Sequence, residues 1–229
     1  IALIIAAFLC AAFLFTQWKV REFERRFPAT GRFVEVEGAR IHYRDLQPEG
    51  AAAGVVVLIH GASGNEADMR LPLGERLVAR GYRVISVDRP GHGWSTRDDA
   101  LSNPARQARQ IRSALDSIGV KRAAVVGHSL AGALTLQLAL DHSDLVDRVV
   151  LLAPVTHPWP GGIATYYKVT AAPVIGPFFA HTLVMPLAMA TMDKALESVF
   201  SPQPPPSDYR NRTGVELVLR PQTFRANAQ

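Results

Sequence analysis

The sequence predicts an α/β fold built on a doubly wound, mostly parallel sheet that carries helices on both faces. Three observations predict it. Strands alternate with helical segments between residues 55 and 152, which is the order of parallel sheets with crossover helices. Residues 55–59 and 84–87 are nearly continuous aliphatic runs, as expected of strands buried on both faces. Both strands end in glycine-rich loops, at the sheet edge where ligands bind in such folds.

The first elements are expected to be a hairpin, a strand and a helix. Residues 32–36 and 41–43 alternate in polarity around a turn at Gly38, so they are expected to pair as antiparallel strands. The strand over residues 55–59 follows. A helix is then expected to begin near Pro72, a residue that suits the first helical turn, and to end before Gly81.

The alternation continues after the strand over residues 84–87. Asn103 and Pro104 are typical of a helix start, and Gly119 is typical of a helix end. The apolar face of this helix consists of Ala108, Ile111, Leu115 and Ile118. A strand at residues 123–126, a further helix, and a sixth strand at residues 149–152 complete the predicted core.

A sharp turn is expected where the strand at residues 123–126 meets the next helix. The turn reads Gly127-His128-Ser129-Leu130-Ala131-Gly132. Small side chains at positions 127 and 131 allow the strand and helix to approach closely. The turn places the Ser129 hydroxyl above a helix N-terminus, where developing negative charge is stabilised. In this context the pattern is typical of a serine nucleophile.

Two further strand ends accompany this turn. The first reads His60-Gly61-Ala62-Ser63-Gly64, and the second reads Asp88-Arg89-Pro90-Gly91-His92-Gly93-Trp94-Ser95. In order and spacing, the three motifs together resemble the α/β-hydrolase family, over about residues 32–155.

The resemblance implies a serine nucleophile at Ser129. It also implies an oxyanion hole formed by the backbone N–H groups of Ala62 and Leu130. The elbow and loop residues expected to support the site are Gly127, His128, Ala131, Gly132, His60, Gly61 and Asp88. Ala131 departs from the more common glycine but is still small. We interpret Asp88 as structural rather than as the triad acid.

The acid and histidine of the resembled family have no counterpart in this sequence. In the family they follow later strands, and no such strands are predicted before Gln229. We therefore expect the chain to be a fragment at its C-terminal end and inactive by itself. Because its first residue is not methionine, we expect residues to be missing at the N-terminal end as well. His128 adjoins the nucleophile in a turn that directs it away, which makes it a poor base. No CxxC or His-x-x-x-His pattern is present, so no metal and no cofactor is expected.

The N-terminal residues 1–18 carry no charge and approach the length that a helix needs to cross a bilayer. We predict a transmembrane anchor here, followed by a juxtamembrane linker at residues 19–31. Membrane lipid is thus an expected partner, and the expected location is a bacterial inner membrane, crossed once. A signal peptide and a buried core helix are the alternatives. Basic and acidic residues alternate after the span, so the side of the membrane stays open.

After the core at residues 32–155, the predicted last region spans residues 156–229. Its segment 171–192 is apolar and interrupted by Pro173, Pro177 and Pro186. In the resembled family an insertion at this place forms a helical cap over the active site. An apolar cap favours an apolar or lipid-like substrate. The alternative is that these side chains pack inward against the core.

Composition narrows the class of function. The 229 residues carry a net charge of +5 without a basic-aromatic pattern, so no nucleic acid is expected as partner. The single cysteine, Cys10, excludes an internal disulfide. We predict a carboxylesterase- or lipase-like hydrolase acting on a small-molecule ester through an acyl-enzyme at Ser129. A cofactor-free haloperoxidase and a non-catalytic, membrane-tethered binding protein are the alternatives. A dehalogenase or an epoxide hydrolase would carry aspartate at the elbow.

Overall fold

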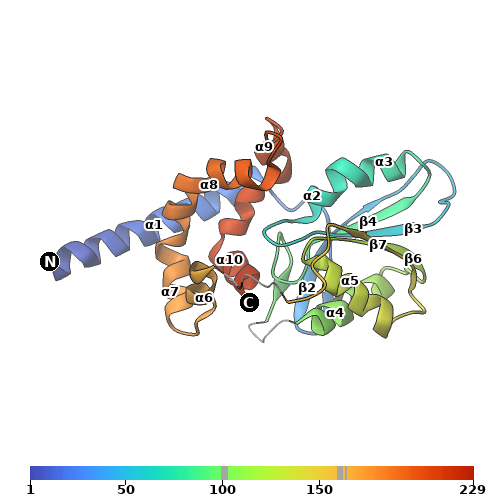
Figure 1. Cartoon of the computed structure of the whole chain (residues 1–229), viewed down its shortest axis with the longest axis horizontal. Helices are drawn as coiled ribbons and strands as arrows, with labels where there is room; N and C mark the ends of the chain where they lie inside the picture. The colour runs from blue at the N-terminus through green and yellow to red at the C-terminus, as the bar shows by residue number, and fades with distance from the viewer. Residues whose placement is uncertain (99–102, 159–161, 163) are drawn as a thin grey trace. The chain divides into compact units, whose positions relative to one another are not determined.

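The computed structural model describes residues 1–98, 103–158, 162 and 164–229. These residues form two compact units (Figure 1). We call Ala29–Gly162 the sheet unit. We call Ile1–Pro28 together with Ile163–Gln229 the helical unit.

The sheet unit is built on a seven-stranded sheet in which β1-β2-β4-β3-β6-β7 lie in that order and β5 pairs with β2. The strands are β1 (Arg32–Val36), β2 (Ala39–Leu46), β3 (Val55–Ile59), β4 (Arg83–Val87), β5 (Thr96–Arg97), β6 (Ala123–His128) and β7 (Val146–Leu152). Strands β4, β3, β6 and β7 are parallel to one another. Strand β2 pairs antiparallel with β4, and β1 and β5 pair antiparallel with β2. The predicted hairpin turns at Gly38, whose φ is +69°.

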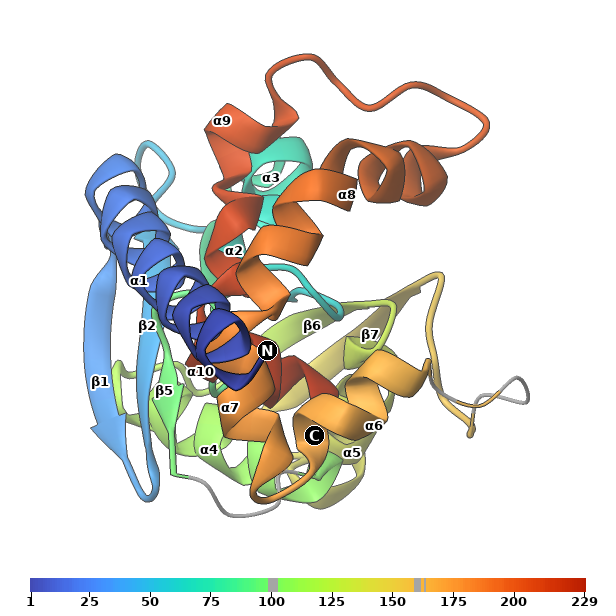
Figure 2. The same cartoon turned by 90° about the vertical axis from the view of Figure 1, so that its left-hand side faces the viewer.

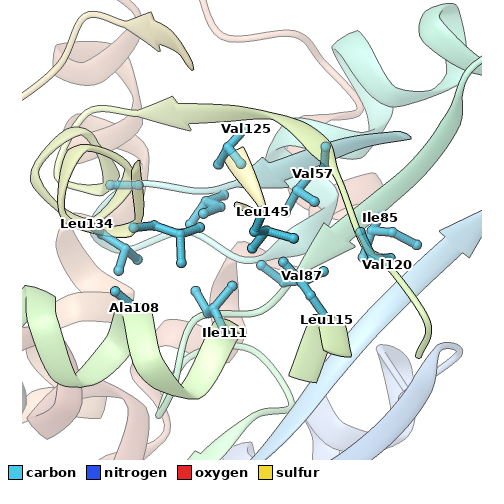
Figure 3. Close-up of a cluster of buried hydrophobic side chains, with 14 of the residues drawn as sticks. Val57, Ile85, Val87, Ala108, Ile111, Leu115, Val120, Val125, Leu134 and Leu145 are labelled. Atoms are coloured by element: carbon cyan, nitrogen blue, oxygen red, sulfur yellow. The ribbon is translucent and has the colours of Figure 1, made fainter. Parts of the chain in front are cut away.

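Helices cover both faces of this sheet, as predicted. On one face, α4 (Pro104–Ser117) and α5 (Ala131–Asp141) pack on side chains of the parallel strands (Figure 3). On the other face, the run α2 (Glu66–Met69), η1 (Arg70–Gly74) and α3 (Glu75–Val78) covers the alternate side chains. Because successive strand residues point to opposite faces, Val57 belongs to the first cluster and Leu58 to the second.

The helix expected to begin near Pro72 begins earlier, at Glu66. The side chain of Asn65 accepts a hydrogen bond from the N–H of Ala67 (2.9 Å). The carboxylate of Asp68 accepts one from the N–H of Asn65 (2.8 Å). This capping box fixes the start. Pro72 lies inside the run, in a π-helical turn, because its missing N–H interrupts the α-helical bonding pattern.

The other predicted elements of the core are confirmed. Helix α4 begins after Asn103, whose side chain accepts a hydrogen bond from the N–H of Arg106 (2.9 Å). It is followed by Gly119 with φ of +76°. The two-residue strand β5 was not predicted. It pairs Arg97 with Ala39, and the N–H of Asp98 donates to the carbonyl of Gly38 (2.9 Å).

Strand β7 forms one edge of the sheet and leaves apolar side chains uncovered. Val149, Val150 and Leu152 are 38%, 42% and 38% exposed. Val149 and Val150 are neighbours in the strand, so they lie on opposite faces of the sheet. A strand with apolar residues on both faces has the composition of an interior strand rather than an edge strand.

The helical unit consists of α1 (Ala2–Arg26), α6 (Thr165–Ala171), α7 (Ile175–Thr182), α8 (Val184–Phe200), α9 (Tyr209–Thr213), η2 (Val215–Leu219) and α10 (Pro221–Ala228) (Figure 2). Helix α1 is continuous through Arg26. Most of the segment expected to be a juxtamembrane linker is therefore helical. Within the described ranges, α1 alone is by itself long and apolar enough to cross a membrane.

Two regions of α1 differ in their surroundings. Near the N-terminus, Leu3 and Ile4 are 86% and 74% exposed. From Ala12 onward, one side of α1 packs into the helical unit, where Thr16 and Phe23 are buried. The ion pair between Glu24 and Arg220 (3.2 Å) lies on the same stretch. Helix α1 is therefore an integral part of its unit over its second half.

Candidate active site

The turn between β6 and α5 holds Ser129 in a strained conformation. Its φ of +52° lies in the left-handed region, which costs a non-glycine residue free energy and is common where function requires it. The N–H of Ser129 donates to the carbonyl of Leu152 (3.0 Å). The carbonyl of Ser129 accepts from the N–H groups of Gly132 and Val155 (2.8 Å each). These bonds fix the turn between β7 and the first turn of α5.

Small residues around Ser129 are required by close packing. A Cβ on Gly127 would lie 2.8 Å from the carbonyl oxygen of Ala131 and would overlap the side chain of Thr135. A Cβ on Gly132 would lie 2.6 Å from that of Pro154. Ala131 is fully buried. The sequence-based requirement for small side chains at positions 127 and 131 therefore has a clear steric cause.

The loop after β3 lies against this turn. Strands β3 and β6 pair in parallel with Ile59 opposite Gly127, so the residues that follow each strand meet at the same sheet edge. A Cβ on Gly61 would lie 2.9 Å from the Cβ of Ser129 and 3.1 Å from the carbonyl oxygen of His128. Glycine at position 61 thus lets the backbone of this loop approach the serine.

The backbone near Ser129 offers two unused donors. Among the residues that the structure describes, the N–H groups of Ala62 and Leu130 donate to no protein acceptor. Ala62 and Leu130 are both exposed. Leu130 directly follows Ser129, and Ala62 directly follows Gly61, whose backbone approaches the Cβ of Ser129.

Both ring nitrogens of His60 form hydrogen bonds with loop backbone, one in the loop after β3 and one in the loop after β4. Its Nε2 accepts from the N–H of Arg89 (3.0 Å), so its Nδ1 carries the proton and donates to the carbonyl of Gly61 (2.8 Å). Burial, assisted by the charge of Arg89, holds the pKa of His60 well below its ordinary value. A neutral ring with both nitrogens engaged is unsuited to act as a base.

Asp88 is engaged in the same way. It is 1% exposed. One carboxylate oxygen accepts from the N–H of Glu66 (2.7 Å), and the other accepts from the N–H of Trp94 (2.8 Å) and contacts Nδ1 of His42 (2.7 Å). These contacts join the loop after β4 to β2 and to the start of α2.

Sequence reasoning missed Arg89, a buried guanidinium at the centre of this edge. It donates to the carbonyl of Gly61 (3.1 Å), to Oε1 of Gln107 (3.1 Å) and to Nε2 of His92 (3.2 Å). Burial lowers the pKa of Arg89 to about 10, with a smaller contribution from Arg97. The position of Arg89 directly after Asp88, at the end of a buried strand, was the available signal for its burial. Arginine is rarely buried unless it has hydrogen-bond partners, and the sequence alone does not show which residues those partners are.

His128 is exposed at the end of β6, directly before Ser129. The carbonyl of His128 faces the Gly61 loop, as the distances from a Gly61 Cβ show. The structure therefore brings together Gly61, His60, Asp88 and the Ser129 turn at one edge of the sheet. Arg89, directly after Asp88, contacts both His60 and Gly61.

The buried His60 predicts a pH-dependent stability. A histidine whose pKa is lowered on folding stabilises the protein above its unfolded pKa of about 6.5, and this contribution is lost as the pH falls below that value. The free energy of unfolding should therefore decrease by up to about 1.4 kcal/mol per pH unit between about pH 6.5 and 5. Urea unfolding in detergent at several pH values measures it.

Two variants make this measurement specific. His60→Gln should reduce the slope of the free energy of unfolding against pH by up to about 1.4 kcal/mol per pH unit, the equivalent of one proton. His157→Gln, at an exposed histidine, should leave this slope unchanged. An unchanged slope in His60→Gln would contradict a neutral, buried His60.

Comparison with known proteins identifies the family. A family model described as the alpha/beta hydrolase fold matches residues 54–209. The chain is 35% identical over 127 residues to the dihydrolipoyllysine-residue acetyltransferase component of an acetoin cleaving system from Cupriavidus necator, covering 56% of this chain and 33% of that protein. It is 36% identical over 135 residues to a 2-hydroxy-6-oxononadienedioate/2-hydroxy-6-oxononatrienedioate hydrolase from Paraburkholderia phymatum, covering 54% and 44%.

A solved structure supports the same fold. The enol-lactonase from Burkholderia xenovorans superposes with a TM-score of 0.62 at 20% identity, over 86% of this chain and 72% of that one. This chain matches 33% of the length of the Cupriavidus necator protein and 44% of the length of the Paraburkholderia phymatum protein, so it spans less than half of either relative. The family match covers more than half of the present chain, and the sheet order and the serine turn agree with it. The chain belongs to the α/β-hydrolase fold family.

Proposed function

We propose that this protein is a serine hydrolase that acts on carboxylic esters of apolar or lipid-like character. The observation that carries the proposal is the strained turn at Ser129, which presents a hydroxyl beside two free backbone N–H groups. A strained serine of this kind is held by the hydrogen bonds around it, and such residues cluster at active sites.

The proposed reaction proceeds through an acyl-enzyme. A base removes the proton of the Ser129 hydroxyl as Oγ attacks the ester carbonyl. The N–H groups of Ala62 and Leu130 stabilise the oxyanion of the tetrahedral intermediate. The alcohol leaves with the proton, and water then releases the acid from Ser129 by the reverse sequence of proton transfers.

We propose that the base and its acid partner come from residues outside this chain. His60 has both ring nitrogens engaged, and Asp88 is fully occupied by the contacts described above. The uncovered edge of β7 supports the proposal, because its apolar side chains would be buried by further parallel strands. We call a protein that includes such strands the longer form.

A fluorophosphonate probe tests the nucleophile, because it reacts with activated serine hydroxyls. In the longer form, we expect the labelled peptide to contain Ser129. Heat-denatured protein is the control and should not be labelled. Labelling at another serine, or labelling that persists in Ser129→Ala, would overturn the assignment.

We also propose that α1 anchors the protein in a membrane. Its length and composition are sufficient, and its N-terminal half is exposed, with Phe8 and Leu14 59% and 65% accessible. Exposed apolar side chains of this number are costly in water, at roughly 25 cal/mol per Å². The burial of Thr16 and Phe23 in the helical unit favours a retained helix over a signal peptide that is removed.

An apolar substrate predicts a dependence on acyl-chain length. Residues 169–192 contain no Asp, Glu, Lys or Arg, and we propose that part of this segment contacts the acyl chain. Each buried methylene contributes about 0.8 kcal/mol, or about four-fold in kcat/KM. Measured on the longer form with p-nitrophenyl esters from acetate to dodecanoate, kcat/KM should rise and then level off. A strict preference for acetate would exclude this role for the segment.

A second candidate function rests on the relative from Paraburkholderia phymatum. Its name describes the hydrolysis of dienedioates, which are dicarboxylates. The charge-free segment at residues 169–192 favours uncharged esters instead. Turnover of a dienedioate by the longer form at a higher kcat/KM than any p-nitrophenyl ester would favour the second candidate.

A further inference from the structure

The helical unit contains a second charge-free segment besides α1. Residues 169–192 lie between Lys168 and Asp193 and form the end of α6, all of α7 and the first half of α8. Helices α7 and α8 are bent by 62° at the break between them. Helix α7 has eight residues, or about 12 Å of length, which is too short to cross a bilayer.

One face of α7 is apolar and exposed. Val174, Ile175 and Phe178 are 83%, 61% and 53% exposed. Their spacing places them on one side of the helix. The opposite side, with Gly176 and Ala180, is buried within the helical unit. Exposed apolar side chains that cluster in this way mark a surface that contacts another apolar phase.

Contacts with α1 define the position of α7 along that helix. The hydroxyl of Thr16 donates to the carbonyl of Ala12 (2.9 Å) and also lies 3.4 Å from the carbonyl oxygen of Thr182. Nε2 of Gln17 lies 3.5 Å from Nδ1 of His181. The rings of Phe13 and His181 are 6.2 Å apart. The C-terminal end of α7 therefore meets α1 between residues 13 and 17, and α7 runs across α1 (Figure 2).

These contacts also define a depth. Lys19 is the first charged residue of α1, and it marks the level of the lipid headgroups if α1 spans a bilayer. At 1.5 Å per residue, positions 13 to 17 lie about 3 to 9 Å below Lys19. Interfacial helices lie about 5–10 Å into the boundary between headgroups and acyl chains. The end of α7 is thus held at the depth of an interfacial helix.

We propose that α1 and α7 dock on a lipid bilayer as one body, with α1 crossing it and α7 lying in the interface. Val174, Ile175 and Phe178 contact the acyl chains. Lys168, an exposed residue that borders the second charge-free segment, contacts the phosphates, whereas Lys19 pairs with Glu22 (2.7 Å) at the end of the first. The proposal rests on the membrane anchoring proposed above. It gives the helical unit a fixed orientation at the membrane.

Depth-dependent fluorescence quenching tests this arrangement. The chain carries one cysteine, Cys10, so a Cys10→Ser background accepts a single new cysteine for labelling with an environment-sensitive fluorophore. Phe178→Cys reports on α7, Leu14→Cys reports on α1, and Ser117→Cys, at an exposed position of α4, is the control. The full chain is reconstituted in phosphatidylcholine–phosphatidylglycerol vesicles that carry a nitroxide either near the headgroup or at the acyl-chain end.

The emission of the label at position 178 should shift to shorter wavelength when vesicles are present. The shallow nitroxide should quench this label more strongly than the deep one. The label at position 14 should be quenched, and that at position 117 should not. Quenching at 14 without quenching at 178 would overturn the docking of α7 and leave the anchor intact. Absence of quenching at 14 would overturn the anchor itself. Stronger quenching of 178 by the deep nitroxide would exclude the interfacial position, and Val174→Cys repeats the measurement on the same face.

Discussion

Replacing Ser129 by alanine is expected to lower kcat of the longer form by about 10⁴- to 10⁶-fold. Without the hydroxyl no acyl-enzyme forms, and only the oxyanion donors and substrate binding still accelerate the reaction. The substitution removes one oxygen and keeps the backbone hydrogen bonds of the turn, so the fold should be retained. Steady-state hydrolysis of a p-nitrophenyl ester measures the effect, with circular dichroism to verify folding.

The matched control is Ser117→Ala on α4. Its hydroxyl is exposed and donates to the carbonyl of Ser113 within the same helix (2.8 Å), so kcat should be unchanged. A Ser129→Ala variant that keeps more than about a tenth of the activity would contradict a nucleophilic role, because triad deletions cost far more.

Replacing Gly127 by alanine is expected to reduce the free energy of unfolding by about 3 kcal/mol. The added Cβ would lie 2.8 Å from the carbonyl oxygen of Ala131 and overlap Thr135. Because the Ala131 carbonyl belongs to the backbone of the first turn of α5, the clash can be relieved only if strand β6 and helix α5 move apart. Overpacking of this kind costs about 1–3 kcal/mol or more. Urea unfolding of the chain in detergent measures the loss.

Two further variants identify the cause. Gly54→Ala adds a Cβ at ordinary contact distance, 3.8 Å from the ring of Tyr82, and should change stability by less than about 0.5 kcal/mol. Adding Thr135→Ala to Gly127→Ala should recover part of the loss only, because the clash with the Ala131 carbonyl stays. Full recovery would show that the side chain of Thr135 alone requires glycine at position 127.

The parallel strands and the serine turn could be predicted because their signals are local. Continuous aliphatic runs identify buried strands, and the need for small residues beside Ser129 follows from the chemistry of one turn. The start of α2 was also present in the sequence, as Asn65 and Asp68. Pro72 was the stronger signal for a helix start, although a proline inside a helical run can also be accommodated by a π-helical turn.

Other features depend on distant residues and could not be predicted. Strand β5 is two residues long and exists because it pairs with β2. The buried Arg89 requires carbonyl and amide partners from two other segments. The second half of α1 is integrated in the helical unit through Thr16, Phe23 and Glu24. A charge-free sequence indicates the first half of that helix but not its packing.

The uncovered edge of β7 has a consequence during synthesis. A ribosome adds about 5–20 residues per second, so residues 153–229, whose described part contains no strand, take about 4–15 s to emerge before any later strand can cover β7. Throughout this time a strand with Val149 and Val150 exposed can pair with the same strand of a neighbouring nascent chain on the polysome. Delivery of α1 to a membrane during translation would separate these chains, and expression without α1 should therefore yield more aggregated protein.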